Sequence, residues 1–203
     1  MIITYNGENY FKIQSGEDSI LIDPTNQRAY KGTAVILNTI KPPFAEPPEG
    51  AEPFWIEHQG EYEIKGIRVV GMNGTSKSSE ISEVSKASKI SEKTIYKIFF
   101  DDIVIGILGG LENEPNKEIQ ENLKGVDIIM VPASGKPYIN QASLAKFLRQ
   151  IEPGIIIPAF FKKSEEVKQF SKEFGQSPKE EEKLVIKKKD TREKGMEIRV
   201  IGF

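Results

Sequence analysis

The feature of this sequence that most restricts its fold is a change of pattern near the middle of the chain. In the first half, short apolar segments at residues 2–5, 10–14 and 19–22 are separated by turn-rich tetrads, which predicts strands joined as hairpins. In the second half, continuous apolar segments alternate with helical patterns. We therefore predict a mixed α/β domain over residues 1–203, with two β-sheets and three helices.

The same rules place the remaining elements. Helices are predicted to begin near Pro115, after a cap at Asn140 and after a cap at Ser164. Four prolines within residues 41–48 predict an extended surface loop, and the Ser-, Lys- and Glu-rich residues 73–92 predict a flexible loop inside the domain. Further strands are predicted at residues 34–37, 54–57, 62–64, 67–70, 94–100, 103–108, 126–131, 155–157, 184–188 and 197–201.

Two residue counts exclude several kinds of chemistry. The 203 residues contain no cysteine, and His58 is the one histidine. Disulfides, iron–sulfur clusters and thiolate-bound zinc are therefore excluded, and a zinc site would receive at most one imidazole. A serine hydrolase of the usual kind would need His58 as its base, yet no nucleophile is adjacent to it in the sequence. We predict a surface histidine at the end of a strand.

The charge pattern argues against nucleic acid and membrane partners. The 28 Lys and Arg residues nearly balance the 30 Asp and Glu residues. The basic segments 162–163 and 187–189 lie beside acidic ones, which is typical of a solvated surface. No apolar segment approaches the ~20 residues of a membrane-spanning helix, and no signal-peptide pattern is visible. We expect a cytoplasmic protein.

The order of several short motifs resembles the metallo-β-lactamase fold superfamily, in particular its small single-domain, Zn-dependent hydrolase-like proteins. No single motif is specific, but they occur in the right order along nearly the whole chain. The resemblance implies an αββα sandwich of two mixed β-sheets flanked by helices, with the site at the sheet edges. The matching segments are Gly7-Glu8-Asn9-Tyr10-Phe11, Leu21-Ile22-Asp23-Pro24, Gly60-Glu61-Tyr62-Glu63-Ile64, Leu108-Gly109-Gly110-Leu111, and the stretches at residues 94–98, 126–132 and 151–158.

The resemblance also implies positions for metal ligands, and this chain departs from the family there. The bridging aspartate of the family aligns with Gly110 and its final histidine aligns with Phe160. These side chains cannot bind zinc. The same holds for the positions aligned with the family's His-x-His-x-Asp-His motif, which are Thr39, Lys41, Pro43 and Phe44.

Asp23 is the one acidic position of the family that this chain keeps, and in the family it orients a metal ligand. Here we predict that it forms hydrogen bonds to the nearby turn. A magnesium or manganese site made of carboxylates would have to use Glu8, Asp23 and Glu61. The segment Ser134-Gly135-Lys136 is interpreted as a turn with an exposed lysine rather than as an anion-binding loop.

These observations favour a pseudoenzyme without a metal centre, cofactor or catalytic residues, which binds a partner protein or a small ligand. Its binding region would be a vestigial cleft that Phe44 and Phe160 make more apolar. Two alternatives remain open, a divergent metal-dependent hydrolase and a homo-oligomeric structural protein. The residues predicted to rim the cleft are Glu8, Asp23, Lys41, Gly110, Ser134 and Phe160.

Overall fold

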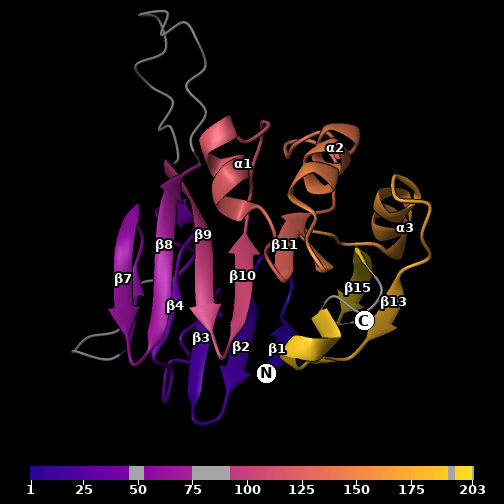
Figure 1. Ribbon diagram of the computed structural model, residues 1–203. Coiled ribbons are helices and arrows are strands. Elements are labelled where there is room, and N and C mark those ends of the chain that lie inside the picture. Colours follow the sequence, from indigo (N-terminus) through magenta and orange to yellow (C-terminus); the bar gives the residue numbers. More distant parts are fainter. Residues whose placement is uncertain (46–52, 75–91, 192–194, 203) are drawn as a thin grey trace, which may run out of the picture.

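Two mixed β-sheets packed face to face form the centre of the structure (Figure 1). The computed structural model describes residues 1–45, 53–74, 92–191 and 195–202. The first sheet has six strands in the order β14 (Leu184–Val185), β1 (Ile2–Tyr5), β2 (Phe11–Ser15), β3 (Asp18–Ile22), β4 (Val35–Leu37) and β6 (Phe54–Ile56). Its hairpins β1–β2 and β2–β3 are antiparallel, whereas β3, β4 and β6 run parallel to one another.

The second sheet has nine strands, of which β5 (Ile40–Lys41) pairs with β9 beside the main row. On one side, β7, β8, β9 and β10 form antiparallel pairs. On the other side, β10, β11, β12, β15 and β13 are parallel. The main row is β13 (Lys179–Glu181), β15 (Glu197–Ile201), β12 (Ile155–Ala159), β11 (Ile128–Pro132), β10 (Ile103–Ile107), β9 (Glu92–Phe100), β8 (Ile67–Asn73) and β7 (Gly60–Ile64).

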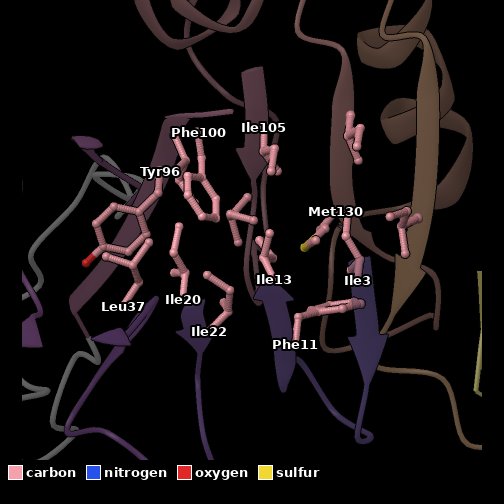
Figure 2. Close-up of a cluster of buried hydrophobic side chains, with 14 of the residues drawn as sticks. Ile3, Phe11, Ile13, Ile20, Ile22, Leu37, Tyr96, Phe100, Ile105 and Met130 are labelled. Atoms are coloured by element: carbon pink, nitrogen blue, oxygen red, sulfur yellow. The ribbon is translucent and has the colours of Figure 1, made fainter. Parts of the chain in front are cut away.

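The core between the sheets follows from strand alternation. Every second residue of a strand faces the same side, so Phe11 and Ile13 of β2 point inward while Lys12 and Gln14 do not. Figure 2 shows inward side chains of the first sheet, among them Phe11, Ile20 and Leu37, facing Tyr96, Phe100, Ile105 and Met130 of the second sheet. Each fully buried side chain of this size contributes roughly 1.5–3 kcal/mol relative to an exposed one. This burial is the main term that holds the sheets together.

The helices of the described residues lie on the outer face of the nine-stranded sheet (Figure 1). They are α1 (Lys117–Leu123), α2 (Gln141–Ile151) and α3 (Ser164–Lys172). The predicted stripe of Leu144, Phe147, Leu148 and Ile151 packs on this sheet. The outer face of the six-stranded sheet carries a smaller cluster of Tyr10, Leu21, Tyr30 and Ile36. No helix in the described ranges has the length and apolar character to cross a bilayer.

The mixed sandwich predicted from the sequence is confirmed, but several element ends differ. Asn140 caps α2 as predicted, since its Oδ1 accepts from the N–H groups of Ala142 and Ser143. Pro115 does not begin α1, because Asn116 is its cap. Ser164 is the first residue of α3 rather than its cap, which is Lys163.

Two further strands were not predicted, for a shared reason. The strand β13 is polar, with the sequence Lys-Glu-Glu, and β5 has only two residues, directly before the first proline of the proline-rich segment. Neither carries the apolar pattern on which strand prediction depends. The predicted strand at residues 184–188 is shorter, since a 3₁₀ helix occupies Lys188–Thr191. Of the predicted loop 73–92, the end residues belong to β8 and β9, and residues 75–91 lie outside the described residues.

A buried carboxylate fastens the C-terminal 3₁₀ helix to the nine-stranded sheet. Asp127, which is 1% exposed, accepts a hydrogen bond of 2.7 Å from the N–H of Val104 and one of 2.5 Å from Nζ of Lys188. The Thr191 hydroxyl donates to it at 3.3 Å. A Cβ on Gly154 would lie 1.7 Å from the Thr191 carbonyl oxygen, so the helix packs directly on this glycine.

We expect Asp127→Ala to lower the free energy of unfolding by about 2–4 kcal/mol, because it leaves buried donors without their acceptor. Urea denaturation of the purified variant measures this loss. Glu121→Ala, at an exposed position of α1, is the matched control and should change it by less than about 0.5 kcal/mol. Equal effects of the two substitutions would contradict this role of Asp127.

Candidate functional site

The carboxyl ends of the parallel strands of both sheets meet at one edge of the sandwich. Ligands of α/β sheets bind preferentially at such an edge. Asp23 follows β3, Thr39 follows β4, Gly110 follows β10, Ser134 follows β11 and Phe160 follows β12. The structure therefore places these predicted residues at the ends of neighbouring strands, although they lie far apart in the sequence.

The carboxylate of Asp23 is the centre of a buried hydrogen-bond network. Asp23 is 1% exposed. Its Oδ1 accepts from the backbone N–H of Thr39 at 2.6 Å, and its Oδ2 accepts from Nδ2 of Asn9 at 2.6 Å. The Thr39 hydroxyl also donates to Oδ2. Burial raises the pKa of Asp23 from 3.8 to about 6, although the donors on Asn9 and Thr39 oppose the shift.

Thr39 fills the space between the two sheets at this edge. A Cβ built on Gly109 would lie 2.5 Å from both Cβ and Oγ1 of Thr39. Gly109 also has a φ of +58°, which disfavours other residues. The backbone of Thr39 is held as well, since its carbonyl accepts from the N–H of Thr94 in β9 at 2.9 Å. The first aligned ligand position is thus occupied by a side chain that packs and hydrogen-bonds.

An aromatic pair packs at this edge beside Gly110, where the cleft was predicted. The rings of Tyr138 and Phe160 lie 4.6 Å apart with an interplanar angle of 33°. A Cβ on Gly110 would be 3.2 Å from Cε1 of Tyr138 and 3.6 Å from Cζ of Phe160. The N–H of Phe160 donates to the carbonyl of Glu8 at 2.6 Å, and the Tyr5 hydroxyl donates to the same oxygen at 2.9 Å.

Left-handed backbone conformations gather at this edge. Glu8, Asp23 and Phe160 have φ values of 52°, 41° and 55°. Such conformations cost non-glycine residues roughly 1–3 kcal/mol each and persist where surrounding contacts impose them. Here the contacts that impose these conformations are the hydrogen bond between Phe160 and Glu8 and the network around Asp23. The edge keeps a strained, defined geometry.

Lys93 ties β9 to the segment that follows β10. Its Nζ donates to the Gly110 carbonyl at 2.6 Å and to Oε1 of Glu112 at 2.6 Å. Burial raises the pKa of Tyr138, and the charges of Glu8 and Glu112 add to this shift. The phenol of Tyr138 therefore stays protonated at neutral pH.

The remaining predicted residues lie apart from this network. Nζ of Lys41 is 3.4 Å from Nε2 of His58, which is exposed at the end of β6 as predicted. Phe44 is 49% exposed and contributes little apolar surface to the cleft, and Pro43 is partly buried. Ser134 is 8% exposed, whereas Gly135 and Lys136 of the same turn are exposed.

The donor set at this edge does not fit the zinc ion that the family would imply. Zinc is held by histidine, cysteine or carboxylate ligands, three or four at a time. Within the described ranges, no three His, Asp or Glu side chains come together as a metal-holding group. Asp23 already accepts from Asn9 and Thr39, and Glu61 pairs with Arg68 at 3.3 Å. Among the described residues, the carboxylates of Glu8, Asp23 and Glu61 therefore do not form the group that a magnesium or manganese ion would need.

Sequence reasoning missed Asn9, Tyr138 and Lys93. Asn9 lies within the Gly7–Phe11 motif, where the sequence pattern predicts a turn between two strands and no further role. Its position beside the carboxylate of Asp23 depends on the pairing of β2 with β3. Tyr138 and Lys93 come from segments without a motif. Only the packing of the two sheets brings them to Phe160 and Gly110.

We expect Gly109→Ala to destabilise the protein by about 2–4 kcal/mol, because it adds both a clash with Thr39 and a strained φ. Gly135→Ala is the matched control in the same region. No atom lies within 4 Å of a Cβ built there, so its effect should stay within about 0.5 kcal/mol. Thermal and urea unfolding of both variants measure the difference, and a mild Gly109→Ala would show that Thr39 does not fill the gap.

Asp23 should make stability depend on pH. Its folded pKa lies above the unfolded value, so the folded state binds the extra proton, and stability falls as the pH rises from 3.8 to about 6. At pH values above this range, Asp23 is ionised in both states, and the free energy of unfolding no longer changes through this residue. Comparing urea unfolding of the wild type and Asp23→Asn between pH 4 and 8 isolates the effect, which should reach about 1–3 kcal/mol. Parallel pH profiles of the two proteins would contradict the buried carboxylate.

Comparisons with known proteins agree with this architecture. A search of curated proteins gave no match. Among solved structures, a protein of Thermotoga maritima assigned to the metallo-β-lactamase superfamily has a TM-score of 0.71 at 16% identity, covering 98% of both chains. Isothiocyanate hydrolase from Delia radicum gut bacteria has a TM-score of 0.66 at 13% identity, covering 100% of this chain and 98% of its own. YhfI from Bacillus subtilis, a metallo-β-lactamase fold protein, has a TM-score of 0.63 at 6% identity, covering 100% and 97%.

At sequence identities this low, the structural similarity shows a shared fold and no more. The family itself is shown by the sequence, since residues 2–159 match the family described as "Beta-lactamase superfamily domain". This match covers the N-terminal hairpins, the Asp23 network and the strands up to the end of β12. The chain therefore belongs to the metallo-β-lactamase superfamily.

Proposed function

We propose that this chain is a non-catalytic binding protein in which hydrogen bonds and aromatic packing replace the metal centre of its superfamily. The observation that carries the proposal is the environment of Thr39. Its hydroxyl and N–H both donate to Asp23, and its side chain fills the gap above Gly109. In a metal site this space would hold a ligand, and Asp23 would orient that ligand.

The chemistry of the edge supports binding rather than hydrolysis. A metal-dependent hydrolase uses its metal to generate a hydroxide and to polarise the substrate. The side chains that hydrogen-bond to Asp23 or stack on Phe160 in the structure are those of Asn9, Thr39 and Tyr138, and none of them is an imidazole or a thiolate. Their aromatic and amide surfaces suit contact with a small ligand or a partner chain.

A metal-dependent hydrolase remains the second candidate. Two of the structurally similar proteins are named as hydrolases. They are isothiocyanate hydrolase and Igni18, a metallo hydrolase from Ignicoccus hospitalis. Their likeness to this chain favours the hydrolase hypothesis only through the shared fold. The two hypotheses differ in whether the purified protein retains a metal.

Elemental analysis of tag-free protein, purified without chelator, tests the proposal. We expect less than about a tenth of an equivalent of any transition metal, because the donors of a structural or catalytic site are missing. Chelator should then leave the melting temperature unchanged, since no bound ligand stabilises the folded state. Near one equivalent of metal, together with a chelator-dependent melting temperature, would overturn the proposal and favour the hydrolase.

A further inference from the structure

We propose that the free edge of β7 is a docking site for an extended segment of a partner protein. The segment would add to the nine-stranded sheet as a further strand, with basic side chains on the outer face of the sheet and apolar side chains on the face toward the core. The inference goes beyond the proposed function and does not depend on it, because it uses the last strand of the sheet rather than the strand ends around Asp23.

The strand β7 is the longest of the four edge strands in the part of the chain that the structure describes (Figure 1). It has five residues, whereas β14 has two and β6 and β13 have three each. Proteins commonly protect edge strands by keeping them short or by charging them, and β13 is both short and charged. The edge of β7 therefore offers more backbone groups to an incoming chain than the other edges do.

The turn after β7 determines which of its backbone groups are free. Ile64 pairs with Ile67, and the two residues between them, Lys65 and Gly66, have φ values of 51° and 75°. These are the features of a two-residue type I′ hairpin. In such a hairpin the pair beside the turn is hydrogen-bonded, and hydrogen-bonded pairs then alternate with pairs that are not. The residues of β7 that alternate with Ile64 therefore point their N–H and C=O groups away from β8.

Glu61 and Glu63 carry these outward backbone groups. Within the described ranges, neither residue has a backbone hydrogen bond to another element on that side. The start of the strand is fixed, because the Tyr62 hydroxyl can donate to the carbonyl oxygens of His58 and Gln59, each at 3.3 Å. Extended peptides bind such an edge through main-chain hydrogen bonds, and a preformed edge needs little ordering on binding.

The outer face of β7 selects the charge of the partner. Tyr62 and Ile64 pack against the core between the sheets, so the side chains of Glu61 and Glu63 lie on the opposite face. Both are exposed, and Glu63 forms no ion pair among the described residues, whereas Glu61 lies 3.3 Å from Arg68. Opposite charges directly across a ladder stabilise it. Lysine or arginine at alternate positions of the added strand therefore fits this edge.

The same two glutamates disfavour a second copy of this chain as the occupant. An antiparallel pair of two β7 strands centred on Tyr62 would place Glu61 of each copy opposite Glu63 of the other. Like charges in such positions destabilise the pair, and charged edges are a common protection against self-association. The edge is thus closed to its own copy and open to a strand of opposite charge.

Phe54 provides the apolar side of the docking site. Ile56, two residues further along β6, belongs to the core between the sheets, so Phe54 is also on the core-facing side of its strand. It is nevertheless 46% exposed, because β6 is the last strand of its sheet. Its ring lies 6.5 Å from that of Tyr62. A strand added about 4.8 Å beyond β7 brings its inner side chains toward this ring, and apolar side chains there would cover it.

Amide hydrogen exchange in the presence of a designed peptide tests the docking site. The peptide acetyl-Lys-Val-Lys-Val-Lys-Val-amide carries lysine on one face of a strand and valine on the other. At saturating peptide, exchange of the N–H groups of Glu61 and Glu63 should slow at least about tenfold, because new ladder hydrogen bonds protect them. The N–H of Tyr62, which already faces β8, should change little.

Matched controls separate strand addition from general attraction between charges. A peptide of the same composition in the order Lys-Lys-Lys-Val-Val-Val lacks the alternation and should not slow exchange at Glu61 and Glu63. Glu63→Lys should weaken binding of the alternating peptide about threefold or more, and Phe54→Ala should also weaken it. Glu180→Lys makes the same charge change at an exposed position of β13, at the other end of the sheet, and should leave binding unchanged.

The wild-type protein is sufficient to overturn the proposal. Unchanged exchange at Glu61 and Glu63 with the alternating peptide, or equal slowing by the peptide without alternation, would remove the docking site. Slowing that increases with protein concentration in the absence of peptide would assign the edge to a second copy and contradict the proposed partner. Metal content does not affect any of these readouts, so the docking site and the proposed function are tested separately.

Discussion

The hydrogen bonds between Asp23 and Thr39 are the interaction on which the functional edge depends. They join the end of β3 to the end of β4. The side chain of Thr39 packs against Gly109, and its carbonyl accepts a hydrogen bond from the N–H of Thr94, so both contacts reach the other sheet. The network thus links both sheets where their parallel strands end. A buried carboxylate is costly unless donors surround it, and here Asn9 and Thr39 supply them.

If the proposed function is correct, other contacts must hold the loops at this edge in place of a metal. In the superfamily a metal would cross-link the same loops, and a bound ligand stabilises only the folded state. In this chain, hydrogen bonds around Asp23 and stacking of Tyr138 on Phe160 hold these loops. The left-handed conformations of Glu8, Asp23 and Phe160 persist because these contacts impose them. Strain is retained where the proposed ligand would bind.

Local sequence signals were sufficient for most of the fold. The alternation in β2 and the stripe on α2 predict which faces are buried, because strand and helix periods differ. The signals failed where a neighbour overrides them. β13 forms because β15 offers an edge to a polar segment. The helix α1 begins after Pro115 rather than with it, because Oδ1 of Asn116 accepts from the N–H of Ile119 and caps the helix there.

The sequence by itself determined which chemistry is open to this protein, since a chain without cysteine and with one histidine lacks the usual ligands of zinc. It also determined the superfamily, through motifs in a fixed order. Only the tertiary structure decided which residues meet. Asn9 reaches Asp23 through the β2–β3 pair, and Tyr138 lies on Phe160 because the strands that precede them, β11 and β12, are parallel neighbours. Such contacts join residues that are distant along the chain, so they depend on sheet order and packing, which no local pattern encodes.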